Sequence, residues 1–97
     1  MSFEFDPAKS TANKAKHGID FVEAQALWND PDRLEVPARS DVESRSIVIG
    51  RIHTTTWAAC VTYRHEETIR IISVRRARAR ERQEYDRGSS PNQRDTS

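Results

Sequence analysis

The chain has very little of several residue types that often define a function. Cys60 is its only cysteine, which excludes an internal disulfide and a structural site built from several cysteines. No apolar run is long enough to cross a bilayer, and the N-terminus lacks the basic start and apolar stretch of a secretory signal. The sequence also lacks a glycine-rich phosphate-binding loop, a zinc-ligand spacing and a recognisable Ser/His/Asp arrangement. These absences predict a soluble cytoplasmic protein that uses no metal and no other cofactor.

The length and charge of the chain narrow the possibilities further. With 97 residues it can form one compact domain but not two. Its net charge of +1 hides an uneven distribution, because residues 1–44 are acidic overall and residues 45–97 are basic and rich in arginine. Such a second half is typical of a surface that binds phosphate, although two solvated faces that attract one another would have the same composition.

The first helix is predicted from its two ends. After a short strand-like segment at residues 3–5, Asp6 is placed to cap a helix, Pro7 suits its first turn and Gly18 suits its end. Small residues recur along it at intervals of four and three: Ala8, Ala12 and Ala15. This spacing predicts a closely packed, buried stripe of alanines.

A second, shorter helix is expected directly afterwards. Asp20 and Glu23 have the spacing of a capping box, in which each side chain bonds to the backbone of the other residue. The apolar residues that follow share one helical face: Phe21, Ala24 and Trp28. Residues 34–36 then alternate like a strand, and the polar stretch at residues 38–44 is typical of a loop.

Beyond this loop the apolar pattern changes from a helical to an alternating period. Residues 47–52 and 57–63 alternate in the manner of two successive strands. A polar turn near His65 leads into residues 68–74, which are rich in β-branched side chains. Three sequential strands predict an antiparallel meander as the core sheet.

The end of the chain contains a helix with a thin apolar face. Residues 77–87 are strong helix formers, but little more than Ala77 and Tyr85 can be buried, so this helix needs a docking surface or a partner. Residues 88–97 have the composition of a disordered tail. The sequence therefore predicts a single α+β domain over residues 1–87, with N-terminal helices and a C-terminal helix packed on a twisted antiparallel sheet.

Three groups of residues form a larger pattern along the chain. The first contains Phe3-Glu4-Phe5-Asp6-Pro7, Asn13, Lys16-His17-Gly18, Phe21, Ala24, Trp28 and Asp30-Pro31. The second contains Ile49-Gly50, Val61, Tyr63 and Arg64. The third contains Ile69-Arg70-Ile71-Ile72-Ser73, Arg75, Ala77, Glu81, Arg82 and Tyr85. Over residues 3–85 this pattern resembles the BrnT family of toxins.

The resemblance implies a fold related to the RelE ribonucleases and the activity of an endoribonuclease toxin in a bacterial type II toxin-antitoxin system. It also implies a cognate BrnA-like antitoxin that holds the toxin inactive, with DNA contacted only through that antitoxin and no contact with membranes. Small departures from the family pattern are Phe5 where Trp is expected, Trp28 where Phe is common, and Thr54-Thr55-Thr56 without the usual Gly. These departures concern loop shape more than the basic residues.

Metal-independent RNA cleavage places three demands on a site. The 2′-hydroxyl must lose its proton as it attacks the phosphorus, the leaving 5′-oxygen must gain one, and charge on the phosphate must be stabilised. Arginine suits the last role, because its planar cation matches two phosphate oxygens. Arg64 and Arg75 are the catalytic candidates of this type. Further basic residues are candidates for RNA binding: Lys16, Arg45, Arg51, Arg70 and Arg76.

Strict alternation along the last strand divides its arginines between two faces. It predicts that Arg75 lies on the same face as Ile71 and Ser73, and that Arg76 lies on the other face with Arg70. Only one member of the pair Arg75 and Arg76 can then face a given cleft.

His17 is the third catalytic candidate, since an imidazole can serve as base or acid near neutral pH. In the last turn of a helix beside Gly18 it can equally complement the helix dipole, and Lys16 has the same two interpretations. Which group is the general base and which the general acid stays open. Glu23 is explained by its capping box, and Tyr85 is better interpreted as a packing anchor than as a proton donor.

Three further residues are candidates for contact with the antitoxin. Arg80, Arg82 and Trp57 are candidate antitoxin contacts, with a solvated surface for the arginines and the core for the tryptophan as alternatives. The rival is a non-catalytic module that binds nucleic acid or protein and acts as a co-repressor, which the arginine-rich half fits equally well. Neither a helix-turn-helix nor the stacked aromatics of an RNA-recognition sheet is present, which argues against direct recognition of DNA bases by this chain.

Overall fold

The computed structural model describes residues 1–38, 44–65 and 67–88 of the chain. Within these residues the elements follow one another as β1 (Ser2–Glu4), α1 (Pro7–His17), the 3-10 helix η1 (Glu23–Asn29), β2 (Leu34–Ala38), β3 (Arg45–Ile52), β4 (Thr55–Arg64), β5 (Thr68–Arg76) and α2 (Ala79–Gly88). Helices packed on a mostly antiparallel sheet confirm the predicted α+β class.

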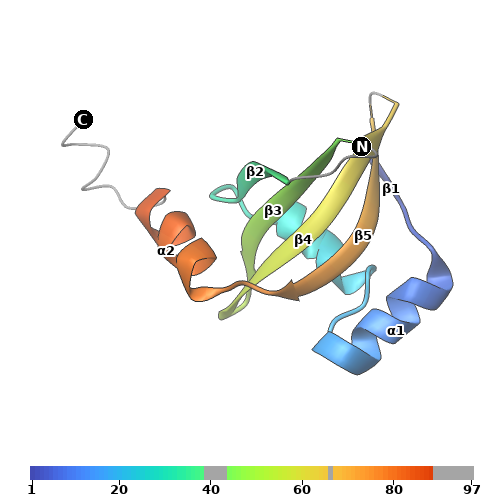
Figure 1. Cartoon of the computed structure of the whole chain (residues 1–97), viewed down its shortest axis with the longest axis horizontal. Helices are drawn as coiled ribbons and strands as arrows, with labels where there is room; N and C mark the ends of the chain where they lie inside the picture. The colour runs from blue at the N-terminus through green and yellow to red at the C-terminus, as the bar shows by residue number, and fades with distance from the viewer. Residues whose placement is uncertain (39–43, 66, 89–97) are drawn as a thin grey trace.

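The strands described form one sheet in the order β1-β5-β4-β3-β2 (Figure 1). The predicted meander is confirmed, because β3, β4 and β5 are antiparallel neighbours and the chain turns at His65 between the last two. β2 adds an antiparallel strand at one edge. At the other edge β1 pairs with β5 in parallel, with Ser2 opposite Thr68. The first and last strands of the domain therefore lie side by side.

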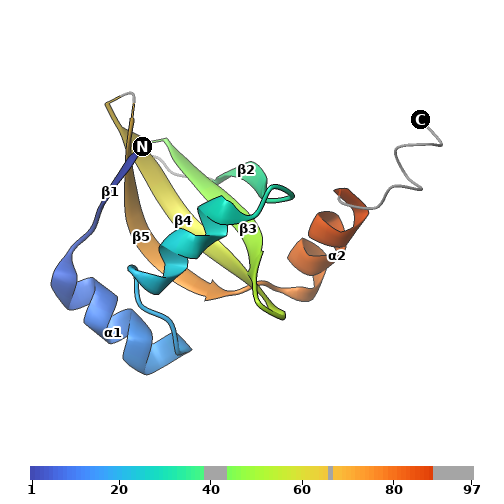
Figure 2. The same ribbon diagram turned by 180° about the vertical axis from the view of Figure 1, so that it is seen from behind.

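The helices divide unequally between the two faces of the sheet. α1 and η1 pack on one side, which we call the helical face; Figure 2 shows η1 lying across it. Phe21 and Val61 belong to its core and are 1% and 0% exposed. On the opposite side, α2 lies at one end and buries Ala77 and Tyr85 against β3 and β4. Figure 1 shows the remainder of this side uncovered by the helices described, and we call this side the open face.

The predicted ends of α1 are correct, but its predicted buried stripe is wrong. The Asp6 carboxylate accepts a hydrogen bond from a first-turn N–H at 2.9 Å, and Pro7 begins the helix. Gly18 ends it with φ 83, a conformation that glycine adopts without strain. The three alanines of the predicted stripe are exposed, whereas Ser10 and Asn13 are buried.

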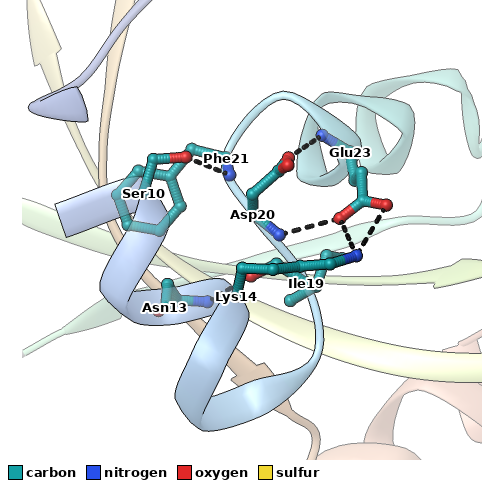
Figure 3. Close-up of polar contacts among 7 residues, drawn as sticks. All are labelled: Ser10, Asn13, Lys14, Ile19, Asp20, Phe21 and Glu23. Carbon is teal, nitrogen blue, oxygen red and sulfur yellow. Dashed lines mark hydrogen bonds and ion pairs between the residues drawn. The ribbon is translucent and has the colours of Figure 1, made fainter. Parts of the chain in front are cut away.

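The buried face of α1 is polar because it bonds to backbone groups (Figure 3). The Asn13 amide donates to the carbonyls of Ile19 at 2.8 Å and Val74 at 2.9 Å, and its oxygen accepts from the Val74 N–H at 3.2 Å. The Ser10 hydroxyl accepts from the Phe21 N–H at 2.9 Å. The spacing of apolar residues cannot predict such a face, because these polar side chains are buried only where backbone groups complete their hydrogen bonds.

The junction between α1 and η1 contains the predicted capping box (Figure 3). The Asp20 carboxylate accepts from the Glu23 N–H at 2.7 Å, and the Glu23 carboxylate accepts from the Asp20 N–H at 3.0 Å. Lys14 Nζ lies 2.8 Å from Glu23 Oε1, and this hydrogen bond lowers the pKa of Glu23 and raises that of Lys14. Glu23 therefore has the structural role that its spacing predicted.

Two predicted boundaries differ in detail. β2 continues through Pro37 to Ala38, which an edge strand tolerates because a proline there costs no ladder hydrogen bond. α2 includes Gly88, so residue 88 does not belong to the predicted tail. The rest of that tail, and residues 39–43 of the predicted loop, lie outside the described residues.

Candidate functional site

The open face gathers five of the predicted arginines. They come from three adjacent strands: Arg45 and Arg51 from β3, Arg64 from β4, and Arg70 and Arg75 from β5. The pairing register places them on the same side of the sheet as Ile49 and Ala58, against which α2 packs. A concentration of positive charge on one face favours a polyanionic ligand.

A β-bulge in β5 corrects the predicted distribution of its arginines. Two adjacent residues of β4 pair with Ile71 and Ser73, so β5 has one extra residue between them. The bulge shifts the alternation, and Arg75 consequently lies on the open face with Arg70. Arg76 lies on the helical face. The prediction from strict alternation, which grouped Arg70 with Arg76, is wrong for this reason.

Glu4, Arg64 and Arg70 form what we call the carboxylate–arginine cluster. Glu4 Oε1 lies 3.5 Å from Arg64 Nε and 3.4 Å from Arg70 Nη1. β1 delivers the carboxylate, because its parallel register sets Glu4 beside Arg70. The three side chains are 39, 53 and 35% exposed, respectively, so a ligand can reach them. A carboxylate beside two guanidinium groups can accept a proton while the arginines hold a phosphate.

Arg75 is held by Glu81 at the start of α2. Its guanidinium donates to both carboxylate oxygens, at 2.7 and 2.9 Å, and Glu81 also accepts from the Arg78 N–H at 2.8 Å. The hydrogen bonds from Arg75 lower the pKa of Glu81. Both side chains are partly buried, so this ion pair attaches α2 to β5. Arg75 is therefore less available to a phosphate than Arg64.

Tyr85 is the anchor of α2, as predicted. Its buried hydroxyl donates to Asp30 Oδ2 at 2.6 Å, and the same oxygen accepts from the Arg51 N–H at 2.8 Å. Burial and the bond to Asp30 raise the pKa of Tyr85 to about 12, so the hydroxyl remains protonated. The Arg51 guanidinium lies 5.4 Å from the centre of the tyrosine ring, which places it over α2.

His17 and Lys16 lie at the end of α1, away from the carboxylate–arginine cluster. Asn13 of the same helix bonds to the backbone of Val74, whose side chain belongs to the core of the helical face. The structure therefore does not bring His17 together with Arg64. Its position in the last turn of α1 fits the interpretation as a helix-dipole partner.

Trp57 and Arg76 belong to the helical face. Trp57 is 8% exposed and packs in the core, and the Arg76 guanidinium lies 5.9 Å from the centre of its ring. This burial favours the alternative interpretation of Trp57, as a core residue, over a role as an antitoxin contact.

A basic hollow of about 300 Å³ lies at the end of the sheet where β3 turns into β4. Three arginines, Arg51, Arg76 and Arg82, outnumber the one carboxylate in its lining, Asp86; Ala77 and the hydroxyl residues 54–56 complete it. Arg82 also donates to a backbone carbonyl at the start of α2, at 2.6 Å, whereas Arg80 is simply exposed on α2. The hollow extends the positive charge of the open face around this end of the sheet.

Neither a metal cluster nor a membrane helix is found in the part of the chain that the structure describes. No group of three or more His, Cys, Asp or Glu side chains in residues 1–38, 44–65 and 67–88 could hold a metal ion. The helices described are too short or too polar to span a bilayer.

The two carboxylates that attach α2 to the sheet, Glu81 and Asp30, should make the stability of the fold sensitive to acid. The hydrogen bonds from Arg75 lower the pKa of Glu81. Burial alone would raise the pKa of Asp30, but the hydrogen bonds that its carboxylate accepts have the larger combined effect, so its pKa is also lowered. A carboxylate whose pKa is lower in the folded state than in the unfolded state stabilises the fold at pH values above its unfolded-state pKa. This stabilisation is lost as the pH falls through the folded-state pKa. Unfolding free energy should therefore drop below about pH 4.

Glu81→Gln should lower the unfolding free energy by about 1–2 kcal/mol at pH 7 and by far less at pH 3, as measured by denaturant titration at each pH. Glu84→Gln is the control, because its exposed carboxylate lies 3.9 Å from Arg87 and contributes less than about 0.5 kcal/mol. An equal loss at both pH values for Glu81→Gln would contradict the assignment.

Residues 5–81 match the family model of the ribonuclease toxin BrnT of type II toxin-antitoxin systems. The crystal structure of the Brucella abortus ribonuclease toxin BrnT is similar, with a TM-score of 0.65 and 26% sequence identity over 80% of this chain and 97% of that chain. No curated protein matches the chain.

These findings define a small α+β ribonuclease toxin. The chain belongs to the BrnT family, the ribonuclease toxins of type II toxin-antitoxin systems. The family and the fold class expected from the sequence are confirmed, and membership of a type II system implies an antitoxin partner.

Proposed function

We propose that the open face binds RNA and that the carboxylate–arginine cluster is the centre at which the chain cleaves it. The observation that carries this proposal is the approach of two guanidinium groups to within 3.5 Å of one exposed carboxylate oxygen. Arg45 and Arg75 on the open face, and the basic hollow at its edge, supply further contacts to the RNA backbone.

The three side chains of the cluster divide the chemistry. Arg64 and Arg70 hold the scissile phosphate and stabilise its added charge. Glu4 takes the proton of the 2′-hydroxyl as the 2′-oxygen bonds to phosphorus, and the bond from phosphorus to the 5′-oxygen breaks. The products are a 2′,3′-cyclic phosphate and a free 5′-hydroxyl.

The leaving 5′-oxygen must gain a proton in the same reaction. His65 follows Arg64 directly, is exposed, and occupies the β4–β5 turn with φ 65. An imidazole can donate a proton near neutral pH. His65 therefore replaces His17 as our candidate general acid, because α1 holds His17 against the other face.

Incubation of the purified chain with a defined RNA in EDTA tests the proposal. We expect fragments that end in a 2′,3′-cyclic phosphate. Binding of RNA should also weaken steeply with salt, because each contacted phosphate of a single strand contributes a slope of roughly −0.7 in a plot of log affinity against log salt. Intact RNA would overturn the proposal and favour the rival function, a non-catalytic co-repressor module.

The partner and location follow from the same proposal. We propose that the antitoxin is BrnA-like and that it contacts Arg80 and Arg82 on α2, beside the open face, so that bound antitoxin excludes RNA. DNA would be contacted only through that antitoxin. The protein would act in the cytoplasm, where its RNA substrate is present.

A further inference from the structure

A second cavity lies on the helical face, at the same end of the sheet as the carboxylate–arginine cluster. It has a volume of about 260 Å³ and includes Trp28 at the end of η1, Tyr63 of β4 and Ile69 of β5. Met1 also lines it, and three charged side chains complete the lining: Arg33, Glu35 and Glu67. Tyr63 directly precedes Arg64 in β4, so the cavity and the cluster are separated only by the sheet itself.

The walls of this cavity suit a flat ligand. Tyr63 is 47% exposed, and its ring is available for stacking. The Trp28 ring is fixed by Phe3, whose ring centre lies 5.0 Å away at an angle of 69°. Buried Ile69 adds an apolar surface. Proteins recognise single-stranded RNA by stacking unpaired bases on aromatic rings and bonding to their edges.

The Glu35 carboxylate is the group in this cavity that can discriminate among the four bases. The Tyr63 hydroxyl donates to it, with both carboxylate oxygens at 2.7 Å. Burial and Glu35 raise the pKa of Tyr63 to about 12, so the hydroxyl stays a donor and orients the carboxylate. An ionised carboxylate has about four acceptor positions, which leaves room for a ligand with two adjacent donors.

Guanine is the base whose pairing edge carries two adjacent donors, N1–H and N2–H. Its neighbouring O6 is an acceptor and suits the guanidinium of Arg33. Adenine and cytosine present a single amino donor beside an acceptor nitrogen, and uracil presents one donor between two acceptors. These three bases therefore leave one oxygen of Glu35 facing another acceptor, which is unfavourable.

We infer that this cavity binds a guanine base that flanks the scissile phosphate, and so sets the sequence preference of cleavage. The inference rests on the proposed function, because it requires RNA to reach the cluster. RNA that crosses the end of the sheet places its phosphate on the open face and an adjacent base on the helical face.

Binding of short oligonucleotides tests the inference separately from cleavage. Pentanucleotides with 2′-O-methyl riboses resist attack by the 2′-oxygen, and one central guanine or adenine can be set among uridines. Fluorescence anisotropy should give tighter binding to the guanine oligonucleotide by roughly tenfold to a hundredfold. Glu35→Gln should remove most of that ratio, because an amide offers one acceptor and one donor.

Two further variants separate recognition from folding and charge. Tyr63→Phe keeps the ring but removes the bond that orients Glu35, and should lose a smaller part of the guanine preference. Glu84→Gln removes the same charge from an exposed site on α2 and should keep the full preference. Thermal melting of each variant verifies that it is folded.

The remaining outcomes distinguish the inference from the proposed function. Equal binding of the two oligonucleotides, or a preference that survives Glu35→Gln, overturns the guanine site. Guanosine monophosphate that binds through Glu35 while the oligonucleotides bind equally would assign the cavity to a free nucleotide, which also overturns it. Intact unmodified RNA together with a Glu35-dependent preference overturns the cleavage centre and supports the base site.

Discussion

Replacing Arg64 or Arg70 by alanine should slow RNA cleavage by roughly a hundredfold to a thousandfold, because each change removes a donor that stabilises the phosphate in the transition state. The unfolding free energy should change by less than about 1 kcal/mol, since the side chains of Arg64 and Arg70 are 53 and 35% exposed and their ion pairs with Glu4 are long, at 3.5 and 3.4 Å. Single-turnover cleavage of a labelled RNA measures the first effect, and thermal melting measures the second.

Two further arginine variants serve as comparisons for Arg64→Ala and Arg70→Ala. Arg87→Ala removes the same charge from an exposed residue of α2 and should cleave RNA at nearly the normal rate. Arg75→Ala should lower both stability and activity, because it also breaks the ion pair with Glu81. If Arg64→Ala and Arg70→Ala both cleave at the normal rate, the cleavage centre lies elsewhere on the molecule.

The second large effect is expected in the core of the helical face. Phe21 is 1% exposed, and its ring centre lies 5.7 Å from that of Phe5. Phe21→Ala should cost about 3–5 kcal/mol of unfolding free energy and lower the melting temperature by more than about 10 °C. Circular dichroism as a function of temperature measures this change.

Val22→Ala is the matched control, because its side chain is 62% exposed one position further along the chain. It should shift the unfolding free energy by less than about 0.5 kcal/mol. A melting temperature for Phe21→Ala close to that of Val22→Ala would contradict the assignment of Phe21 to the core.

The parts of the fold that local chemistry determines were predictable from the sequence. Three features depend only on residues a few positions apart: the N-cap of α1 at Asp6, the end of α1 at Gly18, and the capping box of Asp20 and Glu23. The alternation of the three central strands is equally local. Two features escaped, the polar packing of α1 and the parallel pairing of β1, because both depend on partners far along the chain.

The candidate site was predictable in residue type but not in arrangement. Arginine chemistry singled out Arg64 and Arg75, and the structure places both on the open face. Glu4 carried no signal of its own, because its neighbour Arg70 becomes adjacent only when the sheet forms. The bulge in β5 could not be predicted either, because the alternation of side chains along a strand does not indicate where an extra residue interrupts it.

The pairing of β1 with β5 bears on how the toxin is made. Ser2 and Thr68 meet in the sheet although 66 positions separate them along the chain. A ribosome that adds roughly 5–20 residues per second needs about 3–13 s to synthesise that interval. Throughout that time Glu4 has no Arg70 beside it, so the cleavage centre that we propose cannot form on the nascent chain. On that proposal, cleavage would begin only once β5 has been synthesised and has paired with β1, which gives an antitoxin that is already present a defined moment at which to bind.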